Sequence, residues 1–151
     1  MSTRRILIKR GPASLGIVIL AAALVGAWAI DGRDFAGIYQ TTNEVELGES
    51  VSMTFTTGFV NYSGADIVGA TVRLESPHDP ESPYATFTAV DVAANAGVRL
   101  SQEITVPTRE WDAWRDGAMP RLTVEYLDGE GNTHRRPAEL MRDFLVEEVR
   151  P

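Results

Sequence analysis

Two tryptophans, Trp111 and Trp114, stand three residues apart in the chain, and arginines lie close to both. Residues at positions i and i+3 of a helix share one face, so the two rings would project together. Tryptophan and arginine are enriched among the residues that dominate binding energy at protein interfaces. The spacing therefore predicts a partner-binding group made of Trp111, Trp114, Arg109 and Arg115. In the alternative interpretation, both rings close the open end of a β-sheet domain.

Two further segments contain side chains of the types that bind metals. The first is SPHDPESP at residues 76–83, and the second is DGEGN at residues 128–132. A transition-metal centre needs more ligands than the first segment offers. The second segment lacks the glycine that follows the third ligand of a calcium loop. We therefore interpret the first as a solvated loop and the second as a β-hairpin turn, and we predict no metal and no cofactor.

Composition excludes several chemistries. The chain has no cysteine, which rules out disulfides, thiolate metal sites and cysteine nucleophiles. It has only two histidines, which argues against a histidine-rich metal centre. No G-x-S-x-G, H-E-x-x-H or glycine-rich phosphate motif is present. The net charge of −7 argues against nucleic acid as a partner. We therefore predict that the protein is not an enzyme and binds no nucleic acid.

Charge is distributed unevenly along the chain. All 21 acidic residues follow position 30, whereas every charged side chain among the first thirty residues is basic. These basic groups are Arg4, Arg5, Lys9 and Arg10. Lysine and arginine beside an apolar segment stay on the cytoplasmic side of a membrane. The pattern predicts a cytoplasmic tip at residues 1–10 and an exported acidic body.

Residues 11–30 form a run of twenty uncharged positions between the tip and the body. As a helix this run would be about 30 Å long, which matches the hydrocarbon core of a bilayer. Trp28 near its end would lie at the membrane interface, as would the four basic groups at the other end. The sequence thus predicts a single-pass protein of the inner membrane, with its C-terminal domain in the periplasm.

The tip has a second feature. Residues 3–9, TRRILIK, resemble the twin-arginine export signal, whose pattern is Ser/Thr-Arg-Arg-x-hydrophobic-hydrophobic-Lys. The resemblance implies export of the residues that follow. The apolar run is longer than the core of an ordinary signal peptide, which favours an uncleaved signal-anchor. Ala27-Trp28-Ala29 could instead serve as a cleavage site, and either outcome exports the body.

The body has the pattern of a β-sheet domain. After a connector at residues 31–40, runs of alternating apolar and polar residues recur about every 10–15 residues, with turn residues between them. We therefore predict that residues 41–151 form a mainly β domain. It resembles an immunoglobulin-like antiparallel β-sandwich of about seven strands, although it lacks the Cys-Trp-Cys core of antibody domains. The resemblance is to the architecture and not to a specific family.

Three local features depart from this pattern of alternating strands and turns. Thr108 can act as the N-cap of a short helix at residues 109–116, with Gly117 ending it. Gly58 within an otherwise regular strand indicates a bulge or a kink. Apolar residues at helical spacing over 140–149 favour a terminal helix over an eighth strand.

The sequence thus consists of one membrane-anchoring helix followed by one cysteine-free domain. This organisation predicts a non-catalytic accessory or assembly subunit of a larger membrane complex. Its partners would be the lipid bilayer and other membrane protein subunits, and respiratory or photosynthetic electron-transfer assemblies are the first hosts to examine. A tether raises the effective concentration of a domain near such partners. Two alternatives stay open. One is a free exported module that binds a small ligand, sugar or peptide after signal cleavage, and the other is a pilin-like structural subunit.

Overall fold

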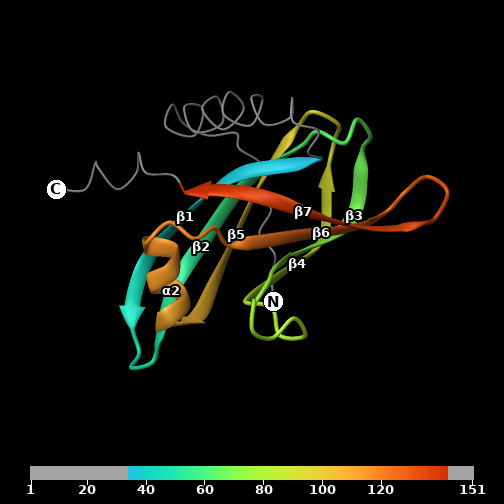
Figure 1. Ribbon diagram of the computed structural model, residues 1–151. Coiled ribbons are helices and arrows are strands. Elements are labelled where there is room, and N and C mark those ends of the chain that lie inside the picture. Colours follow the sequence, from blue (N-terminus) through green and yellow to red (C-terminus); the bar gives the residue numbers. More distant parts are fainter. Residues whose placement is uncertain (1–33, 143–151) are drawn as a thin grey trace, which may run out of the picture.

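The computed structural model describes residues 34–142, which form seven strands and one short helix (Figure 1). The predicted mainly β fold with seven strands is confirmed. The elements along the chain are β1 (Phe35–Glu46), β2 (Ser50–Asn61), β3 (Ile67–Leu74), β4 (Ala85–Val92), β5 (Gly97–Pro107), α2 (Thr108–Arg115), β6 (Arg121–Leu127) and β7 (Thr133–Arg142).

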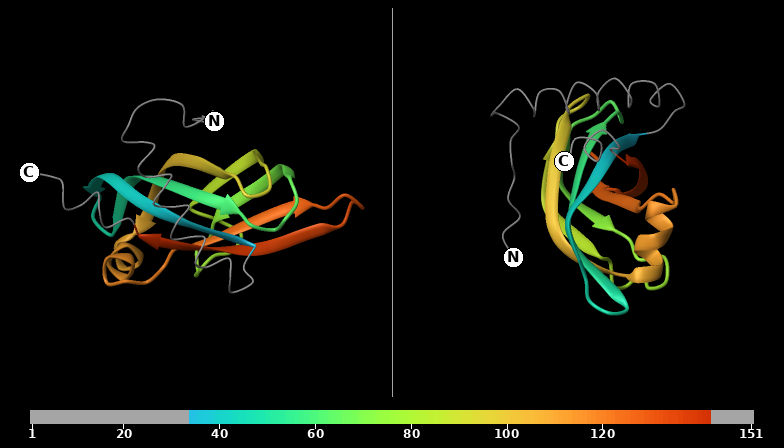
Figure 2. Two further views of the ribbon diagram at one scale, coloured as in Figure 1. Left: turned by 90° about the horizontal axis from the view of Figure 1, so that it is seen from above. Right: turned by 90° about the vertical axis from the view of Figure 1, so that its left-hand side faces the viewer.

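All seven strands belong to one sheet, in the order β4-β3-β6-β7-β1-β2-β5. The sheet curls until it is nearly barrel-shaped, and its two end strands, β4 and β5, approach each other (Figure 2). Neighbouring strands are antiparallel with one exception, because β1 and β7 run parallel from Ala36↔Glu139 to Tyr39↔Arg142. The expectation of a wholly antiparallel sheet is therefore wrong at this pair, and the sheet is mixed.

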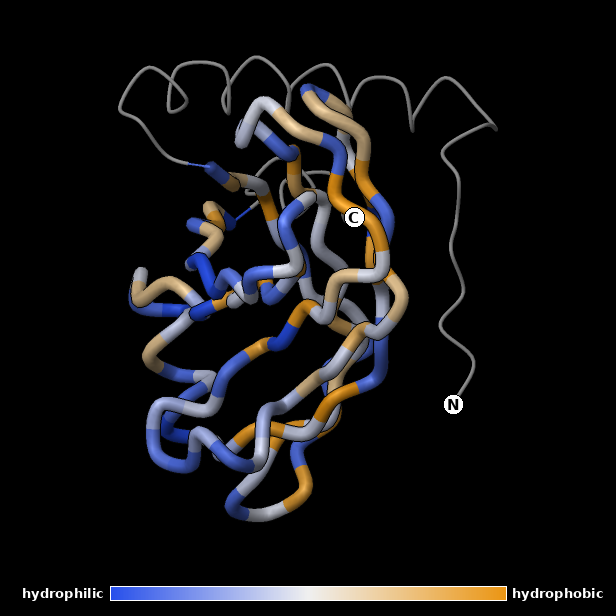
Figure 3. Tube along the Cα trace, turned by 90° about the vertical axis from the view of Figure 1, so that its right-hand side faces the viewer, coloured by the Kyte–Doolittle hydropathy of each residue, from blue (hydrophilic) through white to orange (hydrophobic). Residues whose placement is uncertain are grey.

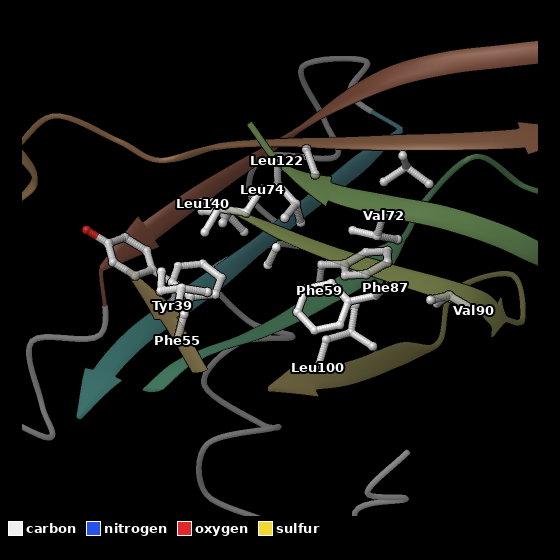
Figure 4. Packing of buried hydrophobic residues seen from close by; sticks show 14 of the residues in the cluster. Tyr39, Phe55, Phe59, Val72, Leu74, Phe87, Val90, Leu100, Leu122 and Leu140 are labelled. Atoms are coloured by element: carbon white, nitrogen blue, oxygen red, sulfur yellow. The ribbon is translucent and has the colours of Figure 1, made fainter. Parts of the chain in front are cut away.

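The core lies inside the curled sheet. Side chains alternate between the two faces of each strand, so every second residue of a strand points inward. Hydrophobic and hydrophilic residues accordingly alternate along much of the trace (Figure 3). Phe59 of β2, Phe87 of β4 and Leu100 of β5 are all buried and lie together in the interior (Figure 4). All seven strands contribute to this one cluster of buried residues.

The first strand begins earlier than the sequence predicted. A connector was expected to reach residue 40, but β1 starts at Phe35. Its first five residues are all buried, including Ile38 and Tyr39. A strand that is covered on both faces has a continuous apolar run instead of an alternating one, so an alternating pattern does not mark its start.

The expected terminal helix is also wrong where the structure describes it. Leu140 and Met141 belong to strand β7, which continues to Arg142. Leu140 is fully buried and stands beside Gly37 in the parallel pairing with β1. This pairing joins residues about one hundred positions apart, and helical spacing within the segment could not reveal it. Residues 143–149 of the expected helix lie outside the described part of the chain.

The predicted bulge at Gly58 is not present. Gly58 pairs regularly with Ile38 on one side and with Arg99 on the other. The register between β1 and β2 shifts instead between Thr42 and Val45, where Asn43 has a φ of 57°. Asparagine tolerates this left-handed conformation better than most residues, which explains why the bulge forms there.

Gly37 provides a test of the close approach between β1 and β2. A Cβ atom at this position would lie 2.8 Å from the Cα of Phe59 and would also collide with the Gly58 carbonyl oxygen. We expect Gly37→Ala to lower the free energy of unfolding by about 1–3 kcal/mol, because buried backbone must move to make room. Urea denaturation of the two proteins measures the difference.

Gly58→Ala is the matched control for this substitution. The atom nearest to its added Cβ would be the Val98 carbonyl oxygen, at 3.9 Å. We expect a change within about 0.5 kcal/mol. Equal losses at the two positions would contradict the proposed crowding at Gly37.

Candidate partner-binding site around α2

Helix α2 lies at one end of the curled sheet, in the connection between β5 and β6 (Figures 1 and 2). Trp111 and Trp114 are both buried, with 9% and 1% of their surface exposed. The two rings share one face of the helix, as the spacing predicted, and their centroids are 6.5 Å apart. That face is turned toward the core. The rings therefore cover the core at this end of the domain and are not presented at the surface.

Trp114 is the centre of an aromatic cluster. Its ring lies 6.3 Å from Tyr39, 6.2 Å from Phe55 and 6.2 Å from Tyr84, measured between centroids. Tyr39 and Phe55 are stacked on each other at 5.6 Å. Offset and edge-to-face arrangements of this kind stabilise aromatic groups beyond the burial of their surface. The cluster joins α2 to β1, to β2 and to the residue that precedes β4.

The start of α2 is held by the turn between β1 and β2. Pro107 occupies the N-cap position, and no side chain caps the helix. Thr108, which was predicted as the cap, is the first helical residue; its N–H donates to the Glu49 carbonyl oxygen at 2.9 Å. Pairing with this distant turn thus takes the place of a local cap. The predicted stop is confirmed, since Gly117 follows the helix with a φ of 106°.

Glu110 links the helix to the loop at residues 76–83, which is distant in the sequence. Its Oε1 atom accepts a hydrogen bond of 3.0 Å from Trp114 Nε1. Its Oε2 atom lies 3.9 Å from His78 Nε2, in the loop at residues 76–83. Burial raises the pKa of the nearby Tyr84 phenol, and the Glu110 carboxylate adds to this effect. His78 and the tryptophans are therefore neighbours in space.

A second contact at α2 was not predicted. The guanidinium carbon of Arg142 lies 5.4 Å from the centre of the Trp111 ring. A cation over the face of an indole ring is attracted by the quadrupole of the ring. Arg142 is the last residue of β7, so the pairing of β7 with β1 brings it to the helix. No signal within the local sequence indicates this contact.

The two predicted arginines occupy exposed positions. Arg115 lies in the last turn of α2, where its charge is favourable to the helix dipole. Arg109 borders an open hollow of about 880 Å³. The hollow is lined by residues 47–50 of the β1–β2 turn, 105–107 of β5 and 108–109 of α2. A role of either arginine in binding a partner stays a prediction.

Apolar side chains are exposed beside this hollow. Val45 and Leu47 are 54% and 55% exposed, and both lie where β1 turns into β2. Glu44 and Glu46 alternate with them in the sequence, and Glu49 follows after Gly48. We call residues 44–50 the docking hairpin. It forms the lowest part of the molecule in Figure 1, beyond the helix.

The segment at residues 128–132 is a turn between β6 and β7, as predicted. Asp128 Oδ1 accepts hydrogen bonds of 2.9 Å from the main-chain N–H groups of Glu130 and Asn132. Asp128 Oδ2 lies 2.7 Å from His134 Nε2. The His134 side chain is the main cause that lowers the pKa of Asp128, and the main-chain N–H of Asn132 adds to the effect. The carboxylate thus holds the turn together.

No three histidine, aspartate or glutamate side chains within residues 34–142 are grouped so that they could hold a metal ion. Over the same range, no helix is long and apolar enough to cross a membrane. The predicted transmembrane segment and its interface residues lie outside the described range. These interface residues are Arg4, Arg5, Lys9, Arg10 and Trp28.

Comparisons with known proteins identify no family. No family model matches the chain, and no curated protein matches it. Northeast Structural Genomics Consortium target SoR45 is a solved structure with 9% sequence identity and a TM-score of 0.39, covering 74% of this chain and 87% of its own. A protein from Archaeoglobus fulgidus has 12% identity and a TM-score of 0.28, covering 72% and 96%. At these scores neither likeness establishes a common fold.

Replacing Trp114 tests whether the aromatic cluster holds this end of the domain. We expect Trp114→Ala to lower the free energy of unfolding by about 3–5 kcal/mol, because it leaves a large cavity among Tyr39, Phe55 and Tyr84. Arg115→Ala, an exposed change on the same helix, should alter it by no more than about 0.5 kcal/mol. Thermal or urea unfolding followed by circular dichroism measures both. Similar values for the two variants would show that the cluster is not stabilising.

Asp128 should make stability depend on pH. Its pKa in the folded protein lies below the ordinary value of 3.8, so ionisation favours the folded state. The stabilisation by the ionised Asp128 carboxylate is fully present at pH values above its ordinary pKa. It is lost as the pH falls toward the lower pKa of the folded protein. We expect Asp128→Ala to be less stable than the natural protein near neutral pH, with the difference shrinking below about pH 4.

Urea titrations at several pH values measure this difference. In a His134→Ala background, the same Asp128→Ala change should have a smaller effect, because the main hydrogen-bond partner is already absent. A difference between Asp128→Ala and the natural protein that stayed constant down to acid pH would rule out the ionised carboxylate as its source.

Proposed function

We propose that this protein is a non-catalytic accessory or assembly subunit of a membrane complex, and that its β domain docks on partner subunits through the end that carries α2. The observation that supports docking there is the exposure of Val45 and Leu47 on a projecting hairpin. Exposed apolar side chains next to a hollow are typical of interaction sites.

The charge of the docking hairpin favours one kind of partner surface. The hairpin contains three glutamates and no basic residue. Potentials across protein interfaces are complementary, so an acidic and apolar hairpin fits a basic and apolar surface. Arg109 at the rim of the hollow can pair with an acidic group at the edge of that surface. We therefore propose a subunit with arginine or lysine around an apolar patch as the partner.

The proposal includes a finer description of the fold, as an immunoglobulin-like sandwich. Its two layers would be β1-β2-β5 and β4-β3-β6-β7, joined by the short parallel pairing of β1 with β7. The connections from β2 to β3, from β4 to β5 and from β5 to β6 each cross between these layers, as Greek-key connections do. Such domains bind partners through the loops and turns at their ends, and the docking hairpin lies at one end.

The anchor is proposed from the sequence alone. Residues 11–30 would cross the inner membrane and hold the acidic body in the periplasm, with the basic tip in the cytoplasm. Such a tether would restrict the domain to the membrane surface, where a weak docking contact suffices because the effective concentration is high.

A double substitution in the docking hairpin tests this function. We expect Val45→Asp with Leu47→Asp to remove the protein from its complex, lowering the fraction that co-migrates with partner subunits at least tenfold, about the loss of one hot spot. Native electrophoresis of mildly solubilised membranes gives this fraction. Val68→Asp is the matched control, because Val68 is 72% exposed but lies on β3. It should leave the fraction unchanged.

Two results would contradict the proposal. One is a natural protein that migrates alone after extraction from its own membranes. The other is a body recovered without its apolar segment, which the intact mass of the extracted protein would reveal as an N-terminus near residue 30. The second result would favour the free exported binding module instead.

A further inference from the structure

The two edge strands of the sheet, β4 and β5, differ in the regularity of their pairing. Along the β4 edge, the pairing with β3 shifts register on both sides of Ala70, and Ala89 of β4 has a φ of 54°. Along the β5 edge, eleven consecutive residues pair with β2 without any shift, from Gly97 to Pro107. Bulges twist an edge away from further pairing, whereas a long regular edge accepts another strand. Within residues 34–142, β5 pairs with β2 on one side only.

The outward side chains of β5 have a symmetric charge pattern. Arg99, Ser101 and Glu103 occupy successive positions on the outer face, since Val98, Leu100 and Ile104 point to the core cluster. Arg99 and Glu103 therefore stand at equal distances on either side of Ser101 and have opposite charges. Neither forms an ion pair with another residue of the described range.

We infer that β5 is a dimerisation edge, at which a second copy of this chain pairs its own β5 antiparallel about a two-fold axis through Ser101. In such an interface the same surface of both copies is used, so each contact occurs twice. Arg99 of each copy lies directly opposite the partner's Glu103. Ser101 lies opposite the partner's Ser101. Opposite charges in directly facing positions stabilise antiparallel strands, and like charges destabilise them.

On the inner face, the same register places Val98 opposite the partner's Ile104 and Leu100 opposite the partner's Gln102, over residues 97–105. A shift by two residues would put Arg99 opposite serine or threonine and would lose both ion pairs. A shift by one residue would turn apolar side chains to the wrong face. The charge pattern of β5 thus selects one register.

The absence of cysteine from the chain makes a direct test possible. Ser101→Cys in the full chain introduces one thiol at the two-fold axis. Directly facing residues have Cβ atoms about 4.5–5.5 Å apart, close enough for a disulfide after a small adjustment. We expect most of the protein, extracted from membranes in mild detergent and gently oxidised, to run as a disulfide-linked dimer on a non-reducing gel.

Thr105→Cys is the matched control. Thr105 lies on the same face of β5 and is exposed. In the proposed register it faces the partner's Gly97, so the two thiols would be eight positions apart, or about 26 Å. Its yield of linked dimer should be at least tenfold lower than that of Ser101→Cys. The double change Val45→Asp with Leu47→Asp should leave the Ser101→Cys yield unchanged, which separates this inference from the proposed docking function.

Charge reversal tests the register. In the Ser101→Cys background, Arg99→Glu should lower the yield about tenfold, because two facing attractions become repulsions. Combining Arg99→Glu with Glu103→Arg should restore it. Circular dichroism melting verifies that each variant is folded. Equal yields at positions 101 and 105, or a folded Ser101→Cys protein that forms no linked dimer, would overturn the inference.

Discussion

The position of β1 between β2 and β7 is the constraint on which the rest of this structure depends. Residues Ala36–Tyr39 pair with β7 on one side, and the same residues pair with β2 on the other. Within residues 34–142, the pairing of this short segment with β7 is the only ladder that joins β1-β2-β5 to β4-β3-β6-β7. Because it lies at the centre of a strongly twisted sheet, the two halves can face each other and share one core. Phe35 illustrates the result, since its ring lies 6.1 Å from Phe59 of β2 and 5.9 Å from Tyr126 of β6.

The end of that pairing explains the helix. Beyond Tyr39, β1 continues to Glu46 along β2, and the pairing with β7 stops at Arg142. The inner face of β1-β2-β5 beyond this point is therefore not covered by the strands of the other half. Trp111 and Trp114 cover it instead, and the contacts of Glu110 with the Trp114 indole and of Thr108 with Glu49 hold this cover in place. The docking hairpin projects beyond the helix as a consequence.

Polar side chains also hold parts of the structure together. Asp128 fastens a turn, and Glu110 joins α2 to the His78 loop. Two surface features support the proposed recognition, namely an exposed acidic and apolar hairpin at one end and a regularly paired, charged edge along β5. The hollow borders both, since it is lined by the hairpin and by the last residues of β5. The proposed docking on a partner subunit and the inferred pairing with a second copy would use different parts of this region.

The sequence by itself determined the mainly β class, most of the strands, the turn at 128–132 and the shared helical face of Trp111 and Trp114. These features depend on periodicity and turn chemistry, which act over a few neighbouring residues. Only the tertiary structure decided that β1 begins at Phe35, that Leu140 belongs to a strand and that the tryptophans face inward. It also brought His78 to Glu110 and Arg142 to Trp111. A strand buried on both faces has no alternation to detect, and contacts between distant segments arise only when the sheet closes around its core.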